Sequence, residues 1–114
     1  MGEALMTQCH CMTPAFSYLD YDTIVLGDDP AYIFGEVRVD TCKACGAKWV
    51  EYLIEEPHYT RSGRWWRAPL GDDNALGLTA ANARGYIEAQ EWCFVGGSYY
   101  DGPIQKQTKP ITVR

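Results

Sequence analysis

The sequence predicts an α+β domain in which a small antiparallel β-meander is joined by one main helix. Two runs of alternating apolar and charged residues lie on either side of a Cys-x-x-Cys turn, and a single helical pattern follows at about residues 80–91. The chain has 114 residues, which is the length of one domain with one hydrophobic core. We therefore expect residues 1–114 to fold as a single unit.

The centre of the predicted sheet is a β-hairpin. Residues 33–41 alternate between apolar and charged side chains, and residues 47–56 do so again, with Val50, Tyr52 and Ile54 facing one side. The turn CKACG connects the two runs. Because strands joined by so short a turn pair in antiparallel fashion, we expect these runs to be neighbours.

Further strands are expected on both sides of this hairpin. The stretch DTIVL at 22–26 is a short strand candidate before it, and RWWRA follows the turn signal RSG after it. Pro57 should end the preceding strand, since proline cannot donate to a sheet ladder. Near the C-terminus, EWCFV, SYY and IQKQTKPITVR are typical of three more extended segments.

The predicted helix follows a segment that favours a loop. LGDDNALG is rich in Gly, Asp and Asn, which favour turns. After it, Thr79 can cap a helix whose Ala80, Ala83 and Ile87 share one face. The sequence therefore predicts one helix over about 80–91.

Composition and charge limit the functional classes. Apolar residues make up 46% of the chain, so most of it should fold, and the net charge of −5 repels a phosphate backbone and favours a basic protein partner. No run approaches the roughly 18 to 20 apolar residues of a membrane span, and the N-terminus lacks a secretory signal pattern. We expect a soluble, cytoplasmic protein, in which five cysteines more often bind metal than form disulfides.

Four of the cysteines have the spacing of a metal site. Cys42 and Cys45 lie in one turn, and Gly46 permits a positive φ that lets the chain leave the turn. Cys9 and Cys11 project to the same side if their segment is extended. These four thiolates predict one structural zinc ion with tetrahedral coordination.

The arrangement CxC…CxxCG resembles the zinc-ribbon class, in which two cysteine pairs hold one ion. The resemblance covers Cys9 to about Glu56 and implies a closed structural site without catalysis by the metal. Four thiolates also suit rubredoxin-like iron, and reduced cysteines without metal are the alternative. His10 and His58 are alternative ligands in place of one cysteine. A thioredoxin-like redox motif is disfavoured because a strand pattern follows Cys45. Cys93 has no paired neighbour and is interpreted as a buried core thiol.

An arginine- and tryptophan-rich segment, residues 61–67, has two interpretations. It can form an interaction surface, because tryptophan and arginine dominate binding energy at interfaces. It can instead be paired internally, with its arginines bonded to Glu51, Glu55 and Glu56 and stacked on tryptophans. The residues concerned are Arg61, Arg64, Trp65, Trp66 and Arg67.

These observations favour a non-enzymatic binding protein. No nucleophile, triad or phosphate loop has the spacing that catalysis needs. In small size, acidity and aromatic content the chain resembles bacterial immunity proteins that neutralise toxins, which implies a basic protein partner. The alternative function is that of a zinc-ribbon accessory protein that contacts single-stranded nucleic acid through residues 61–67. The acids expected to face a basic partner are Glu55, Glu56, Asp72 and Asp73.

Overall fold

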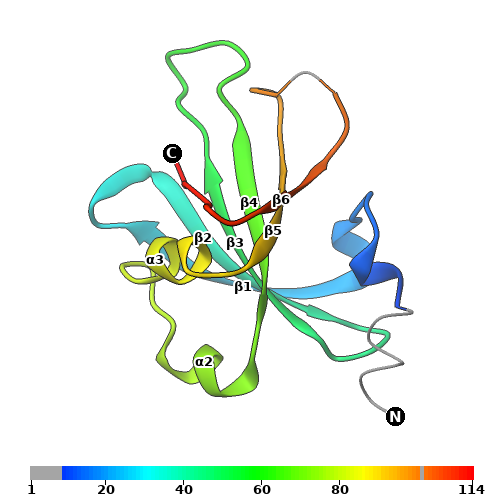
Figure 1. Ribbon diagram of the computed structural model, residues 1–114. Coiled ribbons are helices and arrows are strands. Elements are labelled where there is room, and N and C mark those ends of the chain that lie inside the picture. The colour runs from blue at the N-terminus through cyan, green and yellow to red at the C-terminus, as the bar shows by residue number, and fades with distance from the viewer. Residues whose placement is uncertain (1–8, 101) are drawn as a thin grey trace.

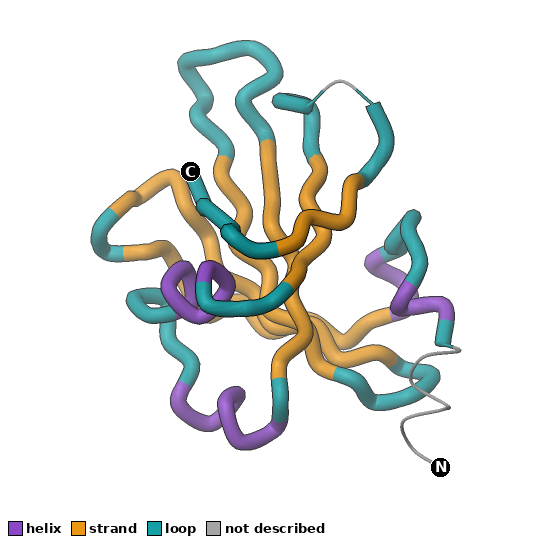
Figure 2. Tube along the Cα trace, in the orientation of Figure 1, coloured by secondary structure: helices purple, strands orange, loops and turns teal. Residues whose placement is uncertain are grey.

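The computed structural model describes residues 9–100 and 102–114, which form one six-stranded antiparallel sheet (Figure 1). The strands lie side by side in chain order, from β1 at one edge to β6 at the other. Their bounds are Tyr21–Asp29 (β1), Tyr32–Cys42 (β2), Lys48–Ile54 (β3), Arg64–Leu70 (β4), Trp92–Gly96 (β5) and Gln105–Thr108 (β6). The helices are short (Figure 2). The 3-10 helices His10–Met12 (η1) and Tyr18–Asp20 (η2) precede β1, and the α-helices Asp72–Gly77 (α2) and Ala83–Glu88 (α3) lie between β4 and β5.

The predicted α+β class is wrong, because the fold is closer to all-β. The single helix expected over 80–91 is reduced to the six residues of α3, since a turn held by Thr79 and Asn82 occupies the residues before it. The Thr79 hydroxyl accepts a bond from the Asn82 N–H at 3.2 Å, and the Asn82 side chain accepts one from the Thr79 N–H at 2.8 Å. The segment expected to be a loop contains α2, whose first turn carries Asp72 and Asp73 beside the helix N-terminus.

The predicted hairpin is confirmed in β2 and β3. Val39 pairs with Val50 and Arg38 pairs with Glu51, in an uninterrupted antiparallel register. The strand candidates on both sides are found as β1, β4, β5 and β6. The expected aromatic strand around Tyr99 is not one, because residues 98–100 form a turn and a bend.

One face of the sheet carries the larger core. Alternate residues of β2 to β5 point to this face, among them Val50, Tyr52 and Trp66, each at most 1% exposed. Ala83 and Ile87 of α3 pack against them, as the helical pattern predicted. The C-terminal segment adds Ile111 and Val113, so α3 and the chain end together close this face.

The opposite face carries a second cluster, covered by residues 9–20. Trp49 and Phe94 are buried here, with Phe16 of the N-terminal segment packed onto both rings at centroid distances of 6.5 and 5.1 Å. Figure 1 shows this blue segment on the side of the sheet away from α3. Among the described residues, no helix has the length and hydropathy needed to cross a bilayer. The four paired cysteines belong to this second cluster.

Candidate metal centre

The turn between β2 and β3 presents two thiols at its tip. The backbone N–H of Cys42 donates to the Ala47 carbonyl and the N–H of Gly46 donates to the Cys42 carbonyl, both at 2.8 Å, which closes the turn. Gly46 has φ of +79°, a left-handed conformation that side chains disfavour. The predicted role of this glycine is confirmed, since the turn brings Cys42 and Cys45 to the same side.

The second pair of thiols comes from a helical turn, so the expected extended segment is wrong. Cys9 lies at the N-cap of η1 and Cys11 inside it, with the Met12 N–H bonded to the Cys9 carbonyl at 3.0 Å. A 3-10 turn shortens the distance between residues two apart, which lets both thiols reach one point. His10 is directed to Asp20, with 3.6 Å between Nε2 and the carboxylate oxygen.

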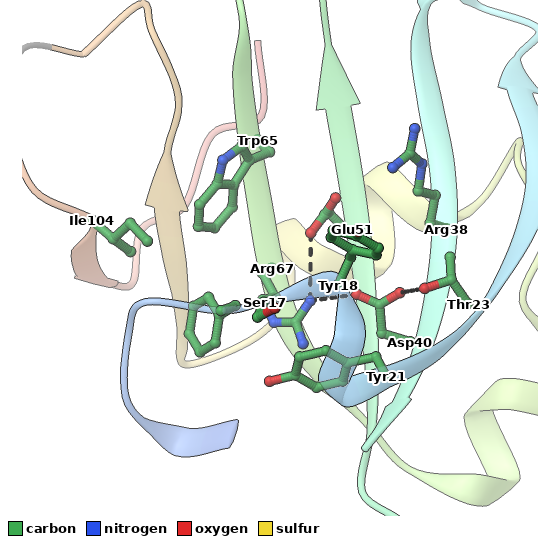
Figure 3. A pocket seen from close by; sticks show the side chains of 11 residues that line it. Ser17, Tyr18, Tyr21, Thr23, Arg38, Asp40, Glu51, Trp65, Arg67 and Ile104 are labelled. Carbon is green, nitrogen blue, oxygen red and sulfur yellow. Dashed lines mark hydrogen bonds and ion pairs between the residues drawn. The ribbon is translucent and has the colours of Figure 1, made fainter. Parts of the chain in front are cut away.

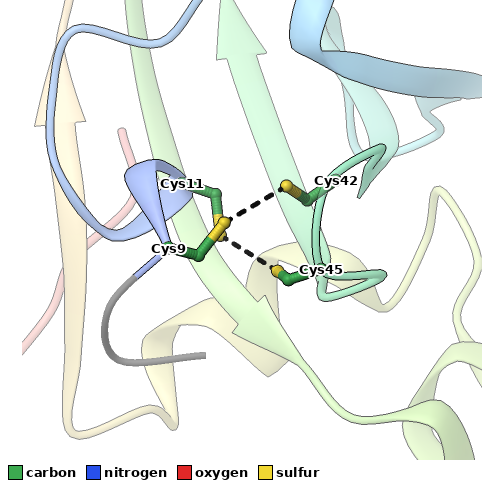
Figure 4. A group of neighbouring side chains, drawn as sticks. All are labelled: Cys9, Cys11, Cys42 and Cys45. Carbon is green, nitrogen blue, oxygen red and sulfur yellow. Dashed lines mark hydrogen bonds between the residues drawn. The ribbon is translucent and has the colours of Figure 1, made fainter. Parts of the chain in front are cut away.

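The four sulfur atoms form a compact group (Figure 4). The Sγ atoms of Cys9 and Cys42 are 3.6 Å apart, as are those of Cys11 and Cys45, and all four lie within 4.8 Å of one another. A disulfide would need about 2.0 Å. Zn–S bonds of about 2.3 Å in a tetrahedron place the sulfurs about 3.8 Å apart. The group therefore fits one metal ion, and its shape fits a zinc-ribbon-like knuckle.

Burial and backbone hydrogen bonding shift the pKa values of Cys9, Cys11 and Cys45 in different directions. The pKa of Cys11 is raised by burial, as is that of Cys45, whereas the pKa of Cys9 is lowered to about 7, chiefly by the backbone N–H of Cys11. The indole Nε1–H of Trp49 is buried without a well-formed hydrogen bond and lies near enough to Cys11 to favour its thiolate. A metal-bound thiolate would accept a hydrogen bond from a buried indole N–H beside it.

No family model, curated protein or solved structure matches the chain. The likeness to a zinc ribbon therefore rests on the four cysteines and the turn that carries two of them. Within the part of the chain that the structure describes, this group consists of cysteine ligands only. His58 lies in the exposed turn after β3, outside the group. Cys93 is fully buried in the larger core, and burial raises its pKa to about 11, so the prediction of a core thiol is confirmed.

The arginines of residues 61–67 have partners within the chain. Arg64 bonds Glu56 at 3.2 Å and stacks on Tyr99, with 5.0 Å from its guanidinium carbon to the ring centroid. Arg61 donates to the Ser98 carbonyl at 3.3 Å. Trp66 and Arg67 are each 1% exposed, so these two side chains are not on the surface.

The predicted acidic residues form two separate pairs, one at each end of β3. Glu55 is exposed just after β3, while Glu56 is half-buried against Arg64. Asp72 and Asp73 are exposed on α2, where Asp72 lies 3.4 Å from the Lys48 ammonium group. They do not form one continuous site with the cysteines.

Sequence reasoning missed a set of residues beside the metal centre. Asp40, on β2, bonds the buried Arg67 of β4 at 2.6 Å, across the intervening strand β3. Phe16 and Tyr21 lie against the same guanidinium, at 4.7 and 4.5 Å. The charged Asp40 within a strand pattern is the sequence signal for the Asp40–Arg67 ion pair. The pattern does not identify the partner, because Arg67 lies 27 positions away in the chain.

Proposed function

We propose that this chain is a non-enzymatic, zinc-binding domain that acts as a protein-interaction module. The observation that supports this function best is the group of four thiols at distances that suit one tetrahedral ion. Four protein ligands fill a tetrahedral shell and leave no position for a substrate, which is typical of structural zinc sites. The ion would fasten residues 9–12 to the turn between β2 and β3.

We propose zinc rather than iron because short, closed sets of four thiolates are the usual ligands of structural zinc. The test is native mass spectrometry and elemental analysis of protein purified without chelators. We expect one zinc ion per chain and a colourless protein. A chain that carries iron would absorb visible light, and a metal-free chain would contradict the proposal.

The proposed partner is a basic protein. The chain has a net charge of −5, and Glu55, Asp72 and Asp73 are exposed and available for long-range attraction. Neutralisation of a toxin, as in the immunity proteins that the chain resembles in general character, would be one form of this activity. We give the nucleic-acid alternative less weight, because Trp66 and Arg67 are buried.

Binding to a basic partner is tested with cross-linking and mass spectrometry at two salt concentrations. We expect captured proteins to be basic, and their capture to weaken as salt rises, because exposed charges are screened. The test variant replaces Asp72 and Asp73 with asparagine, which keeps the shape of α2, and its capture should be weaker. If capture is equal for this variant and insensitive to salt, the proposed role of the acidic surface is wrong.

A further inference from the structure

A cavity of about 220 Å³ lies on the face of the sheet that carries the four cysteines. Figure 3 shows this cavity and its lining side chains. Its walls come from the segment after the first two cysteines, from strands β1 to β4 and from the segment before β6. The apolar wall consists of Phe16, Tyr18, Trp65 and Ile104. Tyr18 is 82% exposed, so the cavity opens to solvent beside this ring.

The floor of the cavity is the buried guanidinium of Arg67. Its Nη1 bonds Asp40 at 2.6 Å and Glu51 at 3.4 Å, as the dashed lines in Figure 3 show. Its Nε and Nη2 atoms are buried without hydrogen-bond partners, and the rings of Phe16 and Tyr21 lie over the guanidinium. A ligand therefore cannot reach these two nitrogens, and Arg67 serves as a covered counter-charge.

Negative charge is left over at Glu51. Arg38, the other cation in the lining, is bonded to Glu36 at 2.6 Å, and Asp40 has the shorter bond to Arg67. Three carboxylates thus share two guanidinium groups. The Glu51 side chain is 18% exposed and lines the cavity. Burial raises the pKa of Glu51, and the nearby Asp40 charge raises it further. Arg67 and Arg38, which lies opposite Glu51 in the register, lower it, but the net direction is upward.

The aromatic wall favours a flat cation. Trp65 and Phe16 meet edge to face, with centroids 6.3 Å apart, and Trp65 shares the sheet face with Glu51. Ring faces attract cations, and tryptophan attracts them most strongly. A guanidinium group is planar, weakly hydrated and able to stack on a ring while it donates to a carboxylate, whereas an ammonium group is a compact and strongly hydrated charge.

We propose that this cavity binds the guanidinium group of an arginine side chain, with Glu51 as its carboxylate partner and Trp65 as its stacking surface. This inference deepens the proposed function, on which it rests, because it names the place where a basic polypeptide is recognised. The Arg67 guanidinium holds Asp40 and leaves Glu51 as the acceptor for the incoming group.

The proposal is tested with N-acetyl-arginine amide, in a titration of the zinc-loaded protein followed by NMR. We expect this ligand to shift the Trp65 indole resonance, which is assigned with Trp65→Phe. The neutral, isosteric N-acetyl-citrulline amide should not bind, and N-acetyl-lysine amide should bind more weakly. A peptide with one central arginine should bind more tightly than the free derivative. Equal binding of the citrulline and arginine compounds, or binding of neither, would overturn the proposal.

Two carboxylate variants locate the site. Glu51→Gln should weaken arginine binding at least tenfold, while Glu91→Gln, which removes one exposed carboxylate outside the cavity, should leave it within twofold. Glu51→Gln should also melt no lower than the wild type, so its loss of binding cannot be assigned to unfolding. Unchanged affinity in Glu51→Gln would refute the assignment. The titration needs no natural partner. If the arginine compound does not bind, the metal analysis stays valid. If it binds to a chain that holds no zinc, only the proposed function is contradicted.

Discussion

Removal of the metal should free residues 9–20 from the sheet. These residues contact the sheet through the Cys9 and Cys11 ligands, through Phe16 on the aromatic cluster and through the entry into β1. A metal ion held by the four thiols would join Cys9 to Cys42, which are 33 positions apart in the chain. Without it, the covered face loses its only cross-link among the described residues.

The expected magnitude follows from the length of that loop. A cross-link that closes a loop of this length lowers the entropy of the unfolded chain by an amount worth about 4 kcal/mol at room temperature. In a domain of this size, that change corresponds to a fall in melting temperature of roughly 10–20 °C. Loss of the metal–sulfur bonds themselves adds to this figure.

The assay is thermal unfolding under reducing conditions, with and without a strong chelator. We expect the chelator to lower the melting temperature of the wild type and to leave the double variant Cys42→Ser/Cys45→Ser unchanged at its lower value. Cys93→Ala is the matched control: it removes a buried thiol of the other core, so it is less stable but keeps its response to the chelator. Equal melting temperatures of wild type and double variant would refute the metal centre.

Three further predictions concern single residues. Glu51→Gln should raise the melting temperature at neutral pH. Because the folded-state pKa of Glu51 is raised, the stability of the wild type falls as pH rises through that pKa. The gain in melting temperature should therefore vanish below about pH 4 in a pH series of melts. Tyr52→Phe should lower the free energy of unfolding by about 1–3 kcal/mol in urea titrations, since the buried Asp29 carboxylate loses a 2.7 Å hydrogen bond. An unchanged urea midpoint would show that this hydrogen bond does not stabilise the fold. Gly46→Ala should lower the free energy of unfolding by about 1–2 kcal/mol through the positive φ alone, because an added Cβ meets no atom within 4 Å. Gly46→Asn should lower it less, and the reverse order would refute the argument.

The sequence predicted the sheet well where the determining interactions are local. Alternation in residues 33–41 and 47–56 reflects the two faces of β2 and β3, and the short CKACG turn allows only neighbouring strands. The helical pattern after Thr79 found the buried face of α3 but not its length. Helices of six residues depend on packing and capping that a pattern over 80–91 does not encode.

The metal site was predictable from the sequence, but the cavity beside it was not. The spacing of Cys42, Cys45 and Gly46 predicts their approach because all three lie in one turn. Asp40 and Arg67 instead meet across a strand that separates them. The expected partner of Arg67 was an acid on the adjacent strand; Glu51 is indeed a partner, but the shorter bond goes to Asp40. Only the sheet register brings these three charges together.

The metal centre and the cavity share the segment that follows Cys11. Phe16 and Tyr18 form part of the cavity wall, and the same segment is fastened at one end by the cysteines and at the other by β1. An ion that fixes this segment therefore lowers the entropy that arginine binding must overcome, and by linkage bound arginine must raise the affinity for the ion by the same factor. We expect N-acetyl-arginine amide to bind more weakly after chelation and to shift an equilibrium competition for zinc with a chromogenic chelator toward the protein, whereas Glu51→Gln should abolish the second effect. If the chelator takes the same fraction of zinc at equilibrium with and without the arginine ligand, the two sites are energetically independent despite the wall they share.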